Sequence, residues 1–183
     1  MGLRAMYIIV LVCLFSLGIQ AKQSIDGLTG LIQMPTAEVV KFQKFEIDAD
    51  FDFDVLTNQV LSTTYQYKMN MGTFENLEMG IIRNKTLDEG VFLNVKYLLM
   101  TDQSRYPLSL AAGTKNIGSK DNSQAFLVLS KPLPRGFQVH FGFKAIFESN
   151  LRSEVMMGFE YLATDWFILQ LELLENEEAY MLN

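Results

Sequence analysis

The chain has 183 residues, with 21 acidic and 15 basic side chains and a formal net charge of −6. An acidic balance of this kind disfavours nucleic acid or an anionic lipid surface as a general partner of the protein. No Pro-rich, Ser-rich or low-complexity stretch divides the sequence into separate parts. We therefore expect one folded domain.

Residues 1–21 have the pattern of a secretory signal peptide. Arg4 precedes an apolar stretch over 5–17, and residues 18–21, Gly-Ile-Gln-Ala, follow it as a plausible cleavage site. The stretch is short for a transmembrane helix, although an uncleaved anchor is the alternative. The only cysteine, Cys13, lies inside this leader. After cleavage we expect a chain with 14 basic and 21 acidic residues and with no disulfide, thiol nucleophile or thiolate metal site.

The most regular pattern of the chain lies at 45–55. One face carries Phe45, Ile47, Ala49, Phe51, Phe53 and Val55, and the other carries Glu46, Asp48, Asp50, Asp52 and Asp54. A period of two predicts a β-strand with one apolar and one polar face. Eleven residues are about what a tilted strand needs to cross a bilayer. Together with the leader, this strand predicts a membrane β-barrel.

Further strands follow with turn residues between them, and no sustained helical period is present. We predict strands over Val60–Met71, Leu77–Asn84, Val91–Thr101, Leu108–Thr114, Ala125–Ser130, Phe137–Phe147, Val155–Tyr161 and Phe167–Leu174, with a short one over Ala179–Asn183. A strand roughly every 12 to 18 residues favours local hairpins over a Greek key.

The predicted fold is all-β: an antiparallel up-and-down β-barrel of about 8 to 10 strands. The predicted organisation is a signal peptide over 1–21, an N-terminal segment over 22–44 and a β-barrel domain over 45–183. With so few strands the lumen is expected to be nearly filled by side chains, so no wide pore is predicted.

Alternation alone does not tell the inside of a barrel from the outside. A soluble barrel of lipocalin type would bury the apolar face, and a membrane barrel would expose it to lipid. The apolar faces are rich in aromatic residues, as interfacial girdles are: Phe45, Tyr65, Tyr67, Tyr97, Phe141, Phe143, Tyr161 and Trp166. This composition favours the membrane barrel, with Ile47, Phe51 and Tyr65 facing lipid.

The polar faces mix acids with lysines, which could pair across a narrow lumen. The candidate lumen charge network consists of Asp48, Asp50, Asp52, Lys68, Lys96, His140, Lys144, Glu160 and Glu172. The acidic row at 46–54 could instead bind a hard cation. Neighbours at i and i+2 on a strand are about 7 Å apart, however, so a ladder of lumen charges is the preferred interpretation and no metal site is predicted.

No catalytic constellation stands out in the sequence. His140 is the only histidine, so a Ser-His-Asp triad or a histidine metal site would have to use it. It lies on a polar strand face beside Gln138 and Gly142, where a hydrogen-bonded lumen or surface residue is the simpler interpretation. We therefore predict no enzymatic activity and no cofactor. A lipid-acting barrel enzyme is the remaining catalytic alternative.

Several short motifs resemble the YjbH-like family of bacterial outer-membrane β-barrel proteins. The main one is GLTGLIQMPTA over 27–37, with Gly27, Gly30, Pro35, Thr36 and Ala37 as its family-like residues. Similar motifs lie at 94–99, 107–113, 130–131, 158–161 and 171–172. The resemblance implies an outer-membrane barrel linked to exopolysaccharide or surface-layer export. It also implies contacts with outer-membrane lipid and with other envelope or polysaccharide-export proteins.

The glycines and the proline of the 27–37 motif also have a backbone interpretation. Glycines permit a tight turn, and Pro35 removes a hydrogen-bond donor from an incoming segment. We favour this interpretation over a ligand-binding role. The predicted function is a small outer-membrane barrel with a structural or export-linked role. The alternative is a soluble periplasmic β-barrel that binds an apolar ligand.

Overall fold

A computed structural model describes residues 23–53, 63–84, 90–101, 107–120, 122–148, 151–164 and 167–174. The predicted leader, the turn after the first strand, Trp166 and the predicted strand at 179–183 lie outside these residues. The described strands are β1 (Phe45–Phe53), β2 (Thr63–Phe74), β3 (Leu77–Asn84), β4 (Gly90–Met100), β5 (Ser109–Ile117), β6 (Ser123–Leu133), β7 (Phe137–Phe147), β8 (Leu151–Thr164) and β9 (Phe167–Leu174). A 3-10 turn at Pro134–Gly136 joins β6 to β7.

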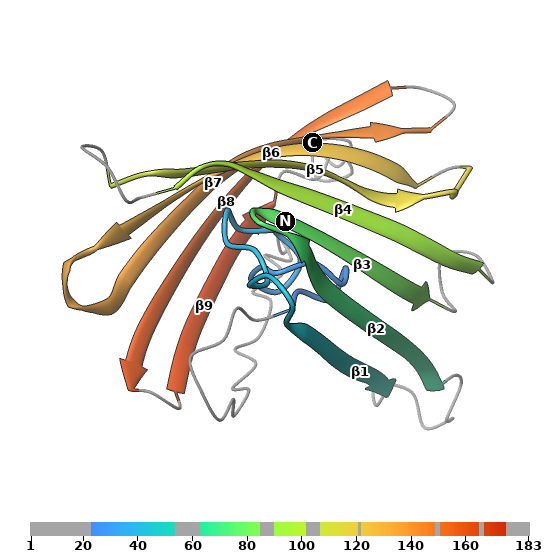
Figure 1. Ribbon diagram of the computed structural model, residues 1–183, viewed down its shortest axis with the longest axis horizontal. Helices are drawn as coiled ribbons and strands as arrows, with labels where there is room; N and C mark the ends of the chain where they lie inside the picture. The colour runs from blue at the N-terminus through green and yellow to red at the C-terminus, as the bar shows by residue number, and fades with distance from the viewer. Residues whose placement is uncertain are drawn as a thin grey trace, which may run out of the picture.

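The nine strands form one antiparallel sheet in which each strand pairs with its neighbours in sequence. This order confirms the all-β up-and-down meander. Figure 1 shows the sheet curling around the N-terminal segment, which is drawn in blue. β1 and β9 are the two edges of the sheet and pair with no further described strand. The described strands therefore form a curled open sheet, and a closed barrel is not shown.

Two predicted turns belong to strands. β6 continues through Pro132, which pairs with Gln138 of β7. Proline is tolerated there because β5 already ends opposite Ser130, so this stretch of β6 lies on an edge. β8 begins at Leu151, in a stretch expected to be a turn. Its polar residues indicate a turn, but Arg152 and Glu154 lie on the inner face of the sheet and Ser153 is exposed on the other face.

Other strand ends differ by a few residues from the predicted ones. β2 extends to Phe74 and meets Leu77 of β3 across a two-residue turn. Asn76 in this turn has a positive φ of 67°, which asparagine tolerates better than most residues. β5 continues to Ile117, three residues beyond its predicted end. The order of the strands is not changed by any of these differences.

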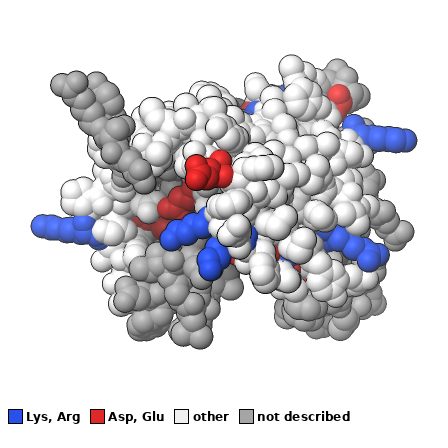
Figure 2. Space-filling view, viewed as in Figure 1, with Lys and Arg blue, Asp and Glu red and all other residues white. Residues whose placement is uncertain are grey.

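The two faces of the sheet have opposite polarity. The outer face exposes large apolar side chains; Phe45 and Ile47 are 68% and 72% exposed. On the inner face Glu78 and Lys96 are fully buried at 0%. Other buried inner polar residues are Gln66, Lys68, Asn70, Asn94, Lys115, Ser130, His140 and Glu154. In Figure 2 most of the described surface on the viewed side is neither acidic nor basic.

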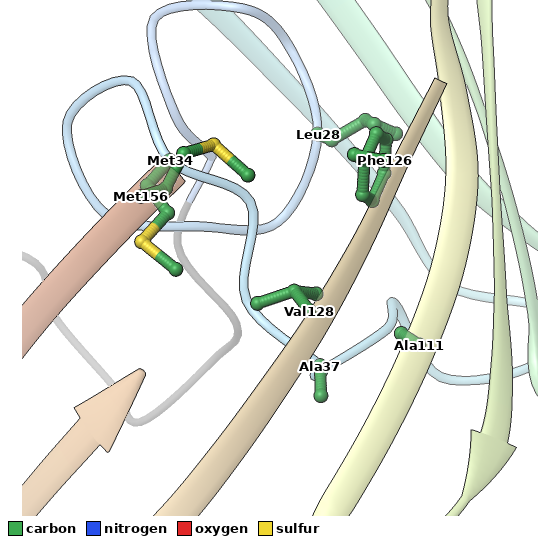
Figure 3. Packing of buried hydrophobic residues seen from close by; sticks show 7 residues of the cluster. All are labelled: Leu28, Met34, Ala37, Ala111, Phe126, Val128 and Met156. Atoms are coloured by element: carbon green, nitrogen blue, oxygen red, sulfur yellow. The ribbon is translucent and has the colours of Figure 1, made fainter. Parts of the chain in front are cut away.

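The N-terminal segment supplies part of the apolar interior. Its Leu28, Met34 and Ala37 are buried at 0–1%. They pack in one cluster with Ala111 of β5, Phe126 and Val128 of β6, and Met156 of β8 (Figure 3). The segment and the sheet thus share one core. None of the described residues forms a helix long and apolar enough to cross a bilayer.

Candidate functional site

The candidate site is the interior of the curled sheet, where inward side chains of the strands meet the N-terminal segment. Within the segment the backbone bonds to itself: Leu31 N–H donates to Met34 O at 2.9 Å and Thr36 N–H to Thr29 O at 3.1 Å. Only isolated bridges, such as Gly30 with Pro35, involve it in β pairing. The 27–37 motif is therefore a compact loop held mainly by side chains of the sheet.

Glu78 of β3 is the centre of the polar contacts. Its carboxylate accepts hydrogen bonds from the Thr29 N–H at 2.8 Å and the Thr29 hydroxyl at 2.7 Å. Asn70 of β2 donates to it at 2.8 Å, and Lys96 of β4 forms an ion pair with it at 3.1 Å. The Lys96 ammonium also donates to Thr29 O at 2.8 Å. A buried charge needs such a set of partners, because desolvation alone is costly.

A second set of charges lies between β1 and β2. The Lys68 ammonium is 3.2 Å from Asp48 Oδ2 and 2.6 Å from Asp50 Oδ2. It also donates to the carbonyl oxygen of Ser24 at 3.0 Å. Lys68 is buried, whereas the side chains of Asp48 and Asp50 are 48% and 39% exposed. This set therefore lies at the rim of the interior.

A third set binds the first turn of the segment from β4 and β5. Lys115 of β5 forms an ion pair with Asp26 and approaches Gln33 O at 3.5 Å. Asn94 of β4 donates to Asp26 O at 2.8 Å and accepts from the Asn116 N–H at 2.8 Å. These contacts hold the backbone of the segment next to Gly27, whose positive φ of 82° makes the turn.

The far edge of the sheet binds the tip of the same loop. The Glu172 carboxylate of β9 accepts hydrogen bonds from the Gln33 N–H at 2.9 and 3.0 Å and from the Met34 N–H at 2.9 Å. At the near edge, the Gln23 side chain donates to the carbonyl oxygen of Glu46 in β1 at 3.1 Å. The N-terminal segment therefore links both edges of the open sheet.

Inward glycines make room for the loop where it passes close to the strands. A Cβ at Gly158 of β8 would collide with Leu31 and lie 3.2 Å from Met34 Sδ. A Cβ at Gly80 of β3 would collide with Asn70 and lie 3.1 Å from Gly27 O. Larger side chains at these positions would displace the segment.

His140 lies on the inner face and is hydrogen-bonded to Ser130. The Ser130 Oγ is 2.8 Å from His140 Nδ1 and accepts from the Ala37 N–H at 2.8 Å. A hydrolytic triad needs a carboxylate on the second ring nitrogen. His140 Nε2 makes no hydrogen bond with any described residue. The pair therefore lacks the third member of a triad, and its visible role is to anchor the end of the loop.

The charges of β7 and β8 pair with one another. Glu154 of β8 is 2.8 Å from Lys144 of β7 and 2.7 Å from Arg152 of its own strand. Further along, Glu160 accepts a hydrogen bond from Gln170 of β9 at 2.7 Å. Both sets of contacts join residues of β7, β8 and β9.

The predicted lumen residues thus fall into separate clusters. Lys68 joins Asp48 and Asp50, whereas Lys96, His140, Lys144, Glu160 and Glu172 each have other partners. The backbone of Asp52 lies in β1, but its side chain is outside what the structure describes. Sequence reasoning missed the central residue, Glu78, and also Asp26, Asn70, Asn94, Lys115, Ser130, Arg152 and Glu154. Glu78 could have been found, because it lies in a predicted strand directly opposite the predicted lumen residue Lys96. Glu154 lies opposite Lys144, but it precedes the predicted strand at Val155–Tyr161.

Among the described residues, no group of three His, Cys, Asp or Glu side chains is placed to hold a metal ion. Of the three described acids in the row predicted as a possible cation site, Asp48 and Asp50 contact Lys68, and the backbone carbonyl of Glu46 accepts from Gln23. No family model, curated protein or solved structure matches this chain.

Proposed function

We propose that this protein is a small outer-membrane β-barrel with a structural or export-linked role in the cell envelope. The observation that carries the proposal is the inverted polarity of the curled sheet. Its outer face exposes Ile47, Phe143 and Leu173, while its inner face buries Lys68, Glu78 and other charged groups. A barrel in a bilayer has this arrangement, because lipid covers the apolar face and the polar groups pair inside.

Strand length supports the same proposal. β2, β4, β6, β7 and β8 have 11 to 14 residues. A tilted transmembrane strand needs about 9–11 residues. A group of outward aromatic rings lies near one end of β7 and β8, where Phe137 stacks on Tyr161 with centroids 4.3 Å apart. Outward aromatic rings near the ends of strands are typical of the interfacial girdle of membrane barrels.

The barrel itself is part of the proposal. β1 and β9 run in the same direction, because eight antiparallel pairings separate them. Direct closure would require a parallel pair of strands. An additional strand between them, such as the one predicted at 179–183, would make every pair antiparallel, as in most barrels of this class.

The link to envelope or exopolysaccharide biogenesis rests on the resemblance of the 27–37 motif to the YjbH-like family. In the proposed barrel this motif fills the lumen, so the protein does not provide a wide conduit. We propose that it acts together with other envelope or polysaccharide-export proteins and that outer-membrane lipid surrounds its outer face. On this proposal the protein is not an enzyme, and His140 has a structural role.

The experiment that tests the proposal is fractionation of cells that express the full chain. Inner and outer membranes are separated, washed with high salt and carbonate, and probed for the protein. Recovery in washed outer membranes, with a gel mobility that changes on heating, is the expected result. Recovery in the detergent-free soluble fraction would contradict it and would favour a soluble periplasmic protein. That alternative would still need an outer face suited to water, whereas the outer face exposes large apolar side chains such as Phe45 and Ile47.

A further inference from the structure

The charged residues of the inner face differ in where their partners come from. The Lys68 ammonium forms ion pairs with Asp48 and Asp50 of β1, and Lys144 and Arg152 form ion pairs with Glu154. Glu78 has Lys96 and Asn70 on adjacent strands. These groups would remain paired if the N-terminal segment left the interior, so its departure would not leave them as isolated buried charges.

Lys115 and Glu172 are different, because their partners among the described residues all belong to the N-terminal segment. Lys115 binds Asp26 and Gln33 O, and Glu172 binds the Gln33 and Met34 N–H groups. The two sets of contacts come from β5 and from the edge strand β9, and both include Gln33. We call these two contacts the latch.

The loop itself is organised to move as a unit. Its backbone hydrogen bonds are internal: Ser24 N–H to Leu28 O at 2.7 Å, Ile25 N–H to Ile32 O at 2.6 Å and Leu31 N–H to Met34 O at 2.9 Å. Among the described residues, backbone hydrogen bonds join the N-terminal segment to a strand only beyond this loop, where the Gln43 N–H donates to Gly72 O of β2 at 2.9 Å and Lys44 O accepts from the Gly72 N–H at 3.0 Å. Displacement would therefore break side-chain contacts and apolar packing without dismantling the sheet.

We propose that the N-terminal segment is a displaceable plug, held in place by the latch together with the contacts of Glu78 and Lys96 to Thr29, and that its displacement opens a passage for small hydrated ions. This inference rests on the proposed membrane barrel. The emptied interior would be lined by the paired charges of β2, β3, β4, β7 and β8, together with apolar side chains of the strands such as Phe126, Val128 and Met156. The charged part of this wall attracts water, and displacement would remove Leu28, Leu31 and Met34 from the interior.

The test uses the full chain with Cys13→Ser and Met156→Cys, so that the introduced thiol is the only one. Met156 is 1% exposed and lies beneath Met34. The latch variant adds Lys115→Met and Glu172→Gln. The matched control adds Glu154→Gln, which changes a buried inner carboxylate that does not touch the plug. Each protein is inserted into liposomes, recovered by flotation and treated with a water-soluble maleimide.

We expect the latch variant to be labelled at least about tenfold faster than the parent, the change produced by a loss of about 1.4 kcal/mol, and the control to match the parent. Its KCl conductance in a planar bilayer should rise as well. Unchanged labelling in a latch variant that floats with liposomes would overturn the proposal. Faster labelling without increased conductance would also overturn it, because the segment would then not close a passage. Failure of the parent to float would instead count against the membrane barrel.

A disulfide lock covers the case in which the latch variant does not fold. A Cβ at Gly27 would lie 3.4 Å from the Cβ of Ile82, close to the separation of about 3.5–4.5 Å in disulfides. The φ of +82° at Gly27 strains a cysteine there, but this strain is the same in the oxidised and reduced states that are compared. The variant Gly27→Cys/Ile82→Cys is studied with Cys13→Ser, and its KCl conductance is compared in the oxidised and reduced states of the same sample. Conductance events should at least halve on oxidation and return on reduction. Equal conductance in both states would contradict a displaceable plug.

Discussion

The two sides of the N-terminal segment are held in different ways. Toward β2, β3 and β4 the contacts are polar, with Lys68, Glu78 and Lys96 directed at its backbone. Toward β6 and β8 the contacts are apolar, with Phe126, Val128 and Met156 packed against it. Burial of apolar area stabilises the folded protein but does not depend on direction. Hydrogen bonds depend on distance and angle, so they form only when the loop lies in one position. We infer that the apolar side supplies stability and that the polar side sets the position of the loop.

The largest effect is expected on the polar side. Glu78→Leu removes the carboxylate and leaves Lys96 buried without its ion-pair partner, which should lower the free energy of unfolding by about 3–5 kcal/mol. The double variant Glu78→Leu/Lys96→Met removes both charges and should recover much of this loss. Urea unfolding of the protein in liposomes measures the difference. Equal stability of Glu78→Leu and the parent would show that the ion pair is solvated.

A substitution on the apolar side should cause a somewhat smaller loss of unfolding free energy. Met34→Ala deletes a fully buried side chain that packs against Met156 and should cost about 2–4 kcal/mol through lost burial and a residual cavity. Its effect should add to that of Asp48→Asn, because the two residues share no partner. The same urea titration gives the value. A loss below about 0.5 kcal/mol, the range typical of surface substitutions, would place Met34 outside the core.

The outer face offers a comparison with both inner sides. Phe143→Lys introduces a charge in the middle of β7 on the exposed apolar face and should cost about 2–3 kcal/mol in a bilayer. Leu133→Lys at the end of β6 should cost about 0–1 kcal/mol, since charges near the membrane interface are tolerated. Equal and small effects for both variants would indicate that water, not lipid, covers this face.

The smallest effect is expected at the rim of the interior. Asp48→Asn removes one of two partners of Lys68, but Asp50 remains at 2.6 Å and the Asp48 side chain is 48% exposed. The loss should be about 1 kcal/mol or less, as for other exposed ion pairs, and should shrink further in high salt. A loss of unfolding free energy as large as that of Glu78→Leu would show that the two ion pairs contribute equally despite their different burial.

The strands were predictable because their alternation is regular. In β1 and β7, apolar and polar residues follow each other with few exceptions, so both the strand and its two faces could be assigned. β3 gives a weaker signal, because its inner face contains Gly80 and Ile82 beside Glu78. Those two residues pack near Gly27 of the N-terminal segment. Some inward positions of a strand are apolar because another segment of the chain packs against them. The alternation of polar and apolar residues does not identify such positions as inward.

The path of the N-terminal segment was not predictable from its own residues. The 27–37 motif has no strand or helix period, and its glycines and proline indicate only turns. Its position depends on contacts with residues far along the chain, such as Glu172, which lies 138 positions after Met34. The start of β8 was missed for a similar reason. Arg152 and Glu154 resemble turn residues until the pairing with Lys144 of β7 is known.

The central claim is that lipid covers the outer face and that the charged face is inside. Fluorescence quenching by brominated lipids tests it most directly. In a Trp166→Phe background the only tryptophan of the chain is removed, and a new one is placed at Phe143 on the outer face or at Phe126 on the inner face. We expect strong quenching of Phe143→Trp in liposomes of brominated lipid and little quenching of Phe126→Trp. Quenching of neither, or of the inner position alone, would contradict the account.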